Sequence, residues 1–403
     1  MKNRFAVLLI LVSLLPPLVS EGMLSLLGMS KLTLCFLQIL DCGLIIVLYV
    51  LYRQKPSVPM VILGAVYATV FASALFHGML TTAVGNFVAG FAMSLVFDFW
   101  LKREYDRFLK ICQAVLILLV LGNLATVLLF PDGMYRDSIY ANNWLLGHKN
   151  GHLAYIINAL LLSVIQSYRK FGKIGISDLC LMAACCLSLY LTDAMMGLFV
   201  TLVFCVITVG LINHTKYREV RFILRIFNLK TMIVFTLVVF FGMMLIHRIP
   251  VLLSAVTKLS NALGRQTPFN GRLPIWNAAI DLIAESPVIG YGIVEGKRFM
   301  ELSGIYGGTH AHNYILNLLI MGGAVCLLEH VGLYAATIRR LDRNRNFGGY
   351  VMHLVLGLYF FAGITNVNFY SSLFNPLFVL AYYVAGNCMA GTNGTVKRVY
   401  KWQ

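Results

Sequence analysis

Charged side chains are scarce in this chain. Only 12% of its 403 residues are Asp, Glu, Lys or Arg, and 59% are apolar. An average soluble domain is about 25% charged and about 45–50% apolar. The mean hydropathy is accordingly high, at +0.80. This composition excludes a soluble globular protein and predicts an all-α integral membrane protein.

Cysteine is absent from the polar segments. All nine cysteines fall within apolar stretches, and the adjacent Cys185 and Cys186 have the spacing of neither a redox pair nor a zinc site. A disulfide framework and a structural metal are therefore excluded. We expect these cysteines to act as small buried apolar residues.

Apolar runs of about 17–25 residues are typical of transmembrane helices. The sequence predicts about twelve of them, at roughly 5–20, 31–52, 58–78, 84–101, 109–130, 152–168, 176–192, 195–213, 231–248, 313–337, 349–367 and 371–390. It shows no internal repeat.

The connecting segments alternate in charge. Most of the 32 Lys and Arg fall in every second one, at residues 2–4, 53–55, 102–110, 169–173, 216–230, 339–345 and 397–401. The positive-inside rule then places both termini in the cytoplasm. Most of the formal charge of +16 is thus topogenic, which argues against a nucleic-acid partner. Residues 1–20 have some features of a signal peptide, but Pro16-Pro17 and the lack of a small-x-small site favour a retained anchor.

One long polar segment interrupts the apolar pattern. The predicted organisation is a transmembrane part at 1–248, an external loop at 249–312 and a second transmembrane part at 313–403. Within the loop, 249–265 and 272–285 have apolar residues at helical spacing and predict short amphipathic helices, the first of them in the membrane interface. A second external segment, 131–151, mixes aromatic, amide and basic residues.

The long loop carries the most informative polar residues. Arg272 and Trp276 share a helix face at its head, and His310 and His312 stand at its foot. Arginine provides a permanently charged fork for phosphate or carboxylate, and histidine can accept a proton near neutral pH. The pattern fits an enzyme acting outside the membrane on a lipid-linked, phosphate-bearing substrate.

The same loop resembles the bacterial O-antigen ligase / O-antigen polymerase family. The shared features are an Arg and a Trp at the head of the loop, a Pro-x-x-Gly-x-Gly turn, and a His-Asn pair at the start of the next helix, followed by Gly. The segment GHKNG around Asn150 resembles, more loosely, an Asn-bearing segment before an earlier helix. The matching residues are Arg272, Trp276, Pro287, Gly290, Gly292, His312, Asn313 and Gly322 or Gly323.

The resemblance implies a metal-independent, inverting glycosyltransferase of the bacterial cell (inner) membrane, without a cofactor, whose active site faces outward. It implies an undecaprenyl-diphosphate-linked oligosaccharide as donor, with a second such glycan or a finished lipid core as acceptor. Partners would be the lipid bilayer, a flippase and a chain-length regulator. Arg272 would hold the donor diphosphate and His312 would accept or orient the acceptor proton. Trp276, Asn313, His310 and Asn150 would be supporting or substrate-binding positions.

Two departures from the family pattern matter. Gly322-Gly323 breaks the G-x-x-G-[ST] spacing of many ligases, which favours a polymerase of O-antigen, capsule or exopolysaccharide. At 191–196, LTDAMM has no basic residue where the family often has Ser-Arg or Ser-Lys. A second diphosphate contact must then come from elsewhere, the candidates being Arg136, Lys149, Arg265, Lys297 and Arg298.

Other functions remain open at this point. A lipid-linked-oligosaccharide flippase or transporter has a similar topology, but it predicts inverted repeats and polar residues at mid-membrane. A paired-carboxylate glycosidase would use Asp281 and Glu285 or their neighbours. Several ionisable residues in or near the predicted spans are further candidates for substrate contact or a proton path: Asp41, His77, Asp98, Asp178, Asp193, Glu329 and His353.

Overall fold

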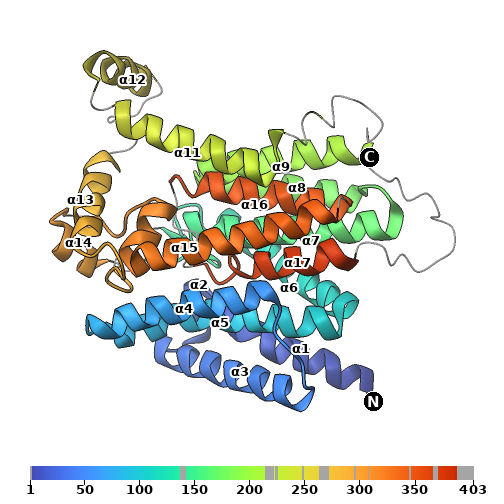
Figure 1. Ribbon diagram of the computed structural model, residues 1–403. Helices are drawn as coiled ribbons and strands as arrows, with labels where there is room; N and C mark the ends of the chain where they lie inside the picture. Colours follow the sequence, from blue (N-terminus) through green and yellow to red (C-terminus); the bar gives the residue numbers. More distant parts are fainter. Residues whose placement is uncertain are drawn as a thin grey trace.

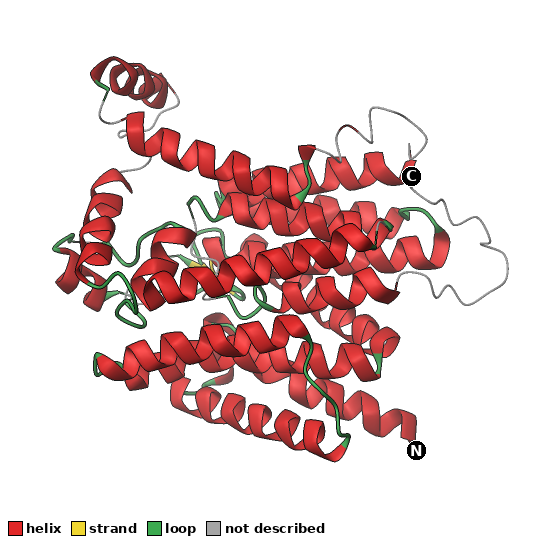
Figure 2. Cartoon of the chain, in the orientation of Figure 1, coloured by secondary structure: helices red, strands yellow, loops and turns green. Residues whose placement is uncertain are grey.

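The described residues of the computed structural model form a bundle of helices with one short hairpin, whose two strands have two residues each (Figures 1 and 2). The predicted all-α class is therefore confirmed. The structure describes residues 2–136, 142–213, 222, 226–246, 249–262, 272–294, 296–306, 308–344, 346–365 and 371–387. The elements are α1 (Lys2–Leu18), α2 (Glu21–Leu27), α3 (Lys31–Leu51), α4 (Val58–Phe76), α5 (Leu80–Arg103), α6 (Tyr105–Leu129), β1 (Asn143–Trp144), β2 (Gly147–His148), α7 (Lys149–Phe171), α8 (Ile176–Leu191), α9 (Met195–Asn213), α11 (Leu229–Ile246), α12 (Pro250–Ala262), α13 (Arg272–Glu285), α14 (Lys297–Ser303), α15 (Tyr314–Arg343), α16 (Phe347–Ala362) and α17 (Pro376–Asn387).

Each apolar run predicted from the sequence coincides with a helix. Within the described residues, α3, α4, α5, α6, α7 and α15 are long and apolar enough to cross a membrane, and α11 with α12 makes a seventh span if that bent pair is counted as one. The helices α1, α8, α9, α16 and α17 are apolar but shorter. The chain is therefore a multi-pass membrane protein, while the number of twelve spans and the orientation stay predictions.

Central and peripheral helices differ in the width of their buried surface. On α3 the buried residues Leu34, Gln38, Asp41, Ile45 and Leu48 form one stripe at spacings of three and four. By contrast, α7 is buried all round from residue 152 to residue 165. A narrow stripe marks a helix with one face on the bundle, and all-round burial marks a helix in its core.

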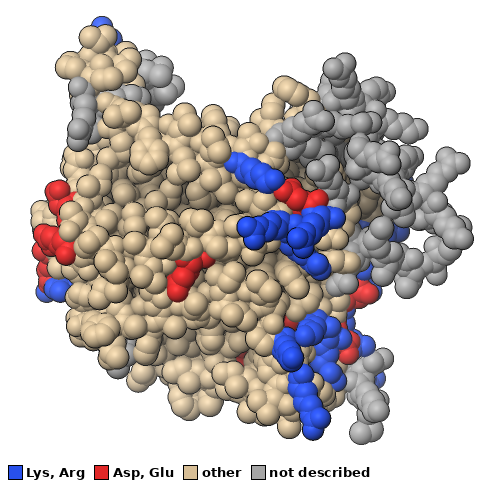
Figure 3. Space-filling view, viewed as in Figure 1, with Lys and Arg blue, Asp and Glu red and all other residues tan. Residues whose placement is uncertain are grey.

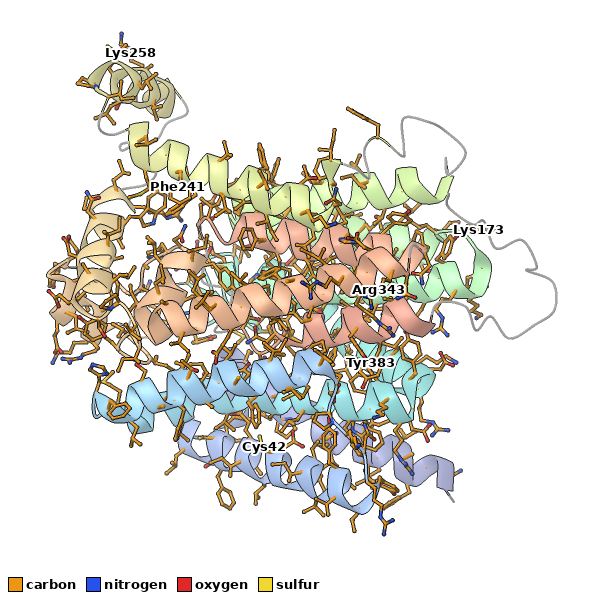
Figure 4. All side chains as sticks on the ribbon, viewed as in Figure 1. Cys42, Lys173, Phe241, Lys258, Arg343 and Tyr383 are labelled. Carbon is orange, nitrogen blue, oxygen red and sulfur yellow. The ribbon has the colours of Figure 1, made fainter. Side chains whose placement is uncertain are left out.

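Basic side chains gather at one end of the bundle, the end at which α1 begins (Figure 3). Lys173 and Arg343 lie there, and Lys258 of α12 lies at the opposite end (Figure 4). This separation agrees with the predicted alternation of basic segments. The division into 1–248, 249–312 and 313–403 rests on the same topology and stays a prediction.

Most carboxylates within the spans are engaged in the protein. Asp98 accepts hydrogen bonds from Tyr49, from the backbone N–H of Ser57 and from Tyr383. Asp178 accepts from Ser163 and from the N–H of Gly175, which caps α8. These contacts hold helices together and leave no free carboxylate for substrate. Glu329 binds Thr69 through one oxygen, and His353 lies 3.5 Å from Asp342.

Asp41 differs from the other carboxylates in the spans. Its side chain is buried, and within the described part of the chain neither of its oxygens has a hydrogen-bond partner.

The helix α15 is broken at Gly323, and the turn 287–292 fills the break. Gly323 has φ 60° and ψ −156°. The N–H groups of Tyr291 and Gly292 donate to the carbonyls of Ile320 and Met321, and the N–H of Ala324 donates to Pro287. Both glycines of the turn are explained by close contacts: a Cβ on Gly290 would lie 2.4 Å from the carbonyl oxygen of Ile320, and a Cβ on Gly292 would lie 2.4 Å from Cα of Ala74 in α4.

Replacing Gly323 with Ala is expected to destabilise the protein. The new Cβ would lie 2.2 Å from the backbone of Val288 at a positive φ, so strain and overlap together should cost about 2–4 kcal/mol. Thermal unfolding of the purified protein in detergent measures this. The matched control is Gly332→Ala in the same helix, where a Cβ meets no atom within 4 Å. Equal melting temperatures for the two variants would contradict the packing described.

The segment predicted to lie in the membrane interface is helical. It forms α12, which leaves α11 at an angle of 106° and stands apart from the bundle (Figure 1). Val251 and Leu252 on α12 are exposed. If α11 crosses the membrane, this angle directs α12 along the membrane plane.

Candidate functional site

The external loop has a small hydrophobic core of its own. Trp276, one turn after the start of α13, is only 1% exposed, and its ring packs edge-on against Phe240 of α11 at 5.6 Å. This contact fixes α13, and with it Arg272, the first residue of that helix. The rest of this core joins α13, α14 and the first part of α15, through Ala279, Leu282, Val294, Phe299, Ala311, Leu316 and Ile320.

The two histidines at the foot of the loop face each other. Their rings lie 4.0 Å apart between centroids, and the backbone N–H of His312 donates to Nδ1 of His310 at 3.1 Å. Nδ1 of His310 therefore carries no proton, and the neutral ring has its proton on Nε2. His312 has a φ of 47°, a left-handed conformation that is uncommon outside glycine and recurs at functional sites.

The positive charge of Arg272 acts on both rings. Burial lowers the pKa of His312 to about 4, with the positive charge of Arg272 as the second cause. Burial, His312, Arg272 and His148 lower the pKa of His310 to about 3. Both rings are therefore neutral at pH 7, and His312 can accept a proton. The structure thus brings His310 and His312 together, within the electrostatic influence of Arg272, and the roles of the three residues stay predictions.

Asn313 has a structural contact for both ends of its amide. Its Oδ1 accepts from the N–H groups of Ile315 and Leu316 and caps α15, and its Nδ2 donates to the carbonyl of Ile364 after α16. The side chain is 1% exposed. These contacts fix the backbone next to His312, so Asn313 is a positioning residue. Direct substrate contact by Asn313 or Trp276 stays a prediction.

Removing this cap should loosen the site. Asn313→Ala is expected to lower the free energy of unfolding by about 1–2 kcal/mol and to reduce activity through a misplaced His312. Asn313→Ser keeps a capping oxygen and should retain most of the stability. Thermal unfolding and turnover of both variants give the comparison, and an Ala variant as stable as the Ser variant would contradict the capping role.

The segment 131–151 contains a short hairpin at residues 143–148. In the hairpin Asn143 pairs with His148 and Trp144 with Gly147. The indole N–H of Trp144 donates to the carbonyl of Phe130, and the N–H of Leu146 donates to Asn123. The charge of His148 contributes to the lowered pKa of His310. The hairpin segment therefore acts electrostatically on the histidines of the long loop.

The candidate second cations differ in their surroundings. Lys149, the first residue of α7, forms an ion pair of 3.1 Å with Asp193 between α8 and α9. Lys297 and Arg298 pair with Glu301 on the same short helix, α14, a pattern of a solvated helix face. Arg136 and Asn150 are exposed, and Arg265 lies outside the described residues.

Sequence reasoning missed His148 and the position of Asp193 opposite Lys149. The signals available were its place in the aromatic and amide-rich segment 131–151 and in GHKNG, where attention went to Asn150. Within the described residues, no group of three His, Cys, Asp or Glu side chains has the arrangement of a metal site.

Comparison with known families gives one match. Residues 179–329 match the O-antigen ligase family. The matched region contains Asp193, Arg272, the glycine turn, both histidines of the loop and the break in α15, whereas Lys149 and the hairpin precede it. No curated protein matches the chain. The resemblance inferred from the loop motifs is thereby confirmed.

Proposed function

We propose that this member of the O-antigen ligase / O-antigen polymerase family polymerises undecaprenyl-diphosphate-linked oligosaccharide units at the outer face of the bacterial cell membrane. The family match supports a membrane enzyme of the glycosyltransferase type. The observation that supports the finer proposal is a neutral imidazole, His312, directly before the capping residue of α15, whose pKa is lowered by burial and by the charge of Arg272.

The proposed reaction needs only a few groups. The oxygen of the acceptor hydroxyl attacks C1 of the donor sugar as the bond between C1 and the phosphate oxygen breaks, and the configuration inverts. The hydroxyl proton passes to His312, and the electron pair leaves with the lipid diphosphate. Arg272 neutralises charge on that leaving group, which is where negative charge develops. No acid has to protonate a leaving group of this kind.

On the acid side, kcat/KM and kcat should fall at different pH values. In the free enzyme the neutral His312 ring persists down to its lowered pKa of about 4, so kcat/KM should fall only below about pH 5. Bound diphosphate pairs with Arg272 and adds negative charge, which favours the protonated ring and raises its pKa toward the ordinary value of about 6.5. The acid limit of kcat should then lie at higher pH.

Steady-state rates between pH 4 and 8, with donor concentration varied, give both profiles. In His312→Asn, the residual activity should no longer fall on the acid side in either profile, because the titrating ring is gone. A wild-type kcat/KM that falls with an apparent pKa near 6.5 would contradict the lowered pKa of His312 in the free enzyme. An acid-side fall of activity that is unchanged in His312→Asn would contradict the role of that ring.

Elongation by the purified protein tests the proposal and separates it from its rivals. Lipid-linked repeat units are supplied in detergent, with and without a chelator. A polymerase gives a ladder of longer lipid-linked products in both samples. A flippase gives no longer product, and a ligase gives product only when a lipid core or another separate acceptor is added. Either of the last two results would overturn the polymerase assignment.

The choice of polymerase rests on sequence alone. Gly322 and Gly323 depart from the glycine spacing of many ligases, and in the structure they have a packing role. A Cβ on Gly322 would lie 2.4 Å from the Cβ of Cys326, and Gly323 receives the turn from Val288. The products of the elongation assay therefore decide between the two transfers.

A further inference from the structure

We propose that Lys149 is the second cation of the donor diphosphate site and that Asp193 is its place-holder, a carboxylate that holds the ammonium group in the free enzyme and is displaced by the diphosphate. This inference rests on the proposed function. The inference adds to the proposed function a binding residue outside the family-matched region and a carboxylate that opposes donor binding.

The backbone at Lys149 is firmly held. Lys149 directly follows the hairpin, whose Trp144 is 3% exposed. The hydroxyl of Ser20, before α2, donates to the carbonyl of Leu145. A Cβ on Gly22 would lie 2.3 Å from the carbonyl oxygen of Trp144, so α2 also packs closely on the hairpin. A cation on such a platform is placed before any ligand arrives, which lowers the entropic cost of binding.

Asp193 is held opposite Lys149 by the turn between α8 and α9. Its φ is 52°, and its N–H donates to the carbonyl of Tyr190. The first turn of α9 lies against both α8 and α7, since a Cβ on Gly197 would lie 3.2 Å from Leu189 and 3.7 Å from Leu153. Aspartate tolerates a left-handed conformation better than most residues, so the turn presents a carboxylate without severe strain.

The ion pair is of a kind that a phosphate can replace. Nζ of Lys149 lies 3.1 Å from one oxygen of Asp193, whose side chain is 72% exposed. An exposed pair with a single contact contributes little to stability. A diphosphate diester carries a charge on each phosphate, so a site with Arg272 alone would leave one charge unpaired. Lysine binds phosphate as a point charge, and Asp193 would turn to solvent.

The place of Lys149 in the chain supports the same assignment. Lys149 directly follows His148, whose charge is among the causes that lower the pKa of His310. Lys297 and Arg298 are instead paired with Glu301 within α14. Of the candidate second cations that the structure describes, Lys149 is thus the one that directly follows a residue whose charge lowers the pKa of His310.

The test uses inorganic pyrophosphate as the probe and the purified full-length protein in detergent. Equilibrium binding is measured for the wild type, Lys149→Ala, Asp193→Asn, the double variant and Arg272→Ala. Asp193→Asn keeps the size of the side chain and its tolerance of a positive φ. Lys258→Ala on α12, which stands apart from the bundle (Figure 1), is the control for loss of one surface lysine. Thermal unfolding confirms that each variant is folded.

We expect Lys149→Ala to weaken pyrophosphate binding roughly 10-fold or more, the range of a charge-assisted hydrogen bond. Asp193→Asn should tighten binding by up to about 5-fold, the range of an exposed ion pair. The tightening should vanish in the double variant, because Asp193 acts through Lys149. With the donor, Asp193→Asn should lower KM and leave kcat nearly unchanged.

Each other outcome has a defined meaning. If Arg272→Ala weakens binding while Lys149→Ala and Asp193→Asn bind like the wild type, the proposed roles of Lys149 and Asp193 are wrong and the proposed function stands. If Asp193→Asn tightens binding equally with and without Lys149, the effect is long-range and the pair is not the device, which also overturns the inference. If none of the variants changes pyrophosphate binding, the diphosphate site itself is wrong.

Discussion

Replacing Arg272 with Ala is expected to reduce glycan elongation roughly 100- to 1000-fold, the usual effect of removing one preorganised group that stabilises developing charge. Arg272 is the first residue of α13, and its charge lowers the pKa of both loop histidines. Without it, the leaving diphosphate would lose its nearest fixed cation. The measurement is the initial rate of elongation by purified protein at saturating acceptor.

Arg272→Lys is the informative companion. It keeps the charge but loses the planar fork that binds two phosphate oxygens, so its rate should lie between those of the wild type and the Ala variant. Membrane level and melting temperature control for folding. Wild-type polymer length and rate in a folded Ala variant would remove Arg272 from the site.

Replacing His312 should have an effect of similar or greater size, because general-base assistance is worth roughly 100- to 10,000-fold. The substitution has to respect the backbone, since His312 adopts a φ of 47°. Asparagine is among the residues that tolerate this conformation, so His312→Asn removes the base with little strain. His312→Ala removes the base and also strains the turn.

The comparison of these two variants separates chemistry from architecture. Both should lose activity to a similar extent, while only the Ala variant should also lose stability. Retained activity in His312→Asn combined with its loss in His312→Ala would show that the turn matters and the ring does not. Donor binding should persist in His312→Asn, because Arg272 is untouched.

Hydrophobic patterning was enough to find the helices, because membrane-length apolar runs have few alternative structures. Periodicity also located α13, with Trp276 on its buried face. The break in α15 was not predicted from the sequence. Gly322-Gly323 lies within an apolar run, and its conformation depends on the distant turn at 287–292 that bonds to it. Such contacts between remote segments are not encoded in local pattern.

The site was predicted in part for the same reason. Arg272, His310 and His312 stand out because polar residues are rare in this chain, and in the structure the charge of Arg272 acts on both rings. Asn313 was predicted as a supporting position, and the structure gives that support a physical form as a helix cap. The neighbourhood of Lys149, Asp193 and His148 depends on how α7, α8 and the hairpin pack, which a single sequence does not reveal.

The most direct test of the account is a single-turnover reaction of purified protein with lipid-linked donor and acceptor, in the presence of a chelator. The account predicts one molecule of lipid diphosphate released for each new glycosidic bond, and a large loss of both products in Arg272→Ala and His312→Asn. Release of no lipid diphosphate by folded wild-type protein, or wild-type turnover by both variants, would contradict it.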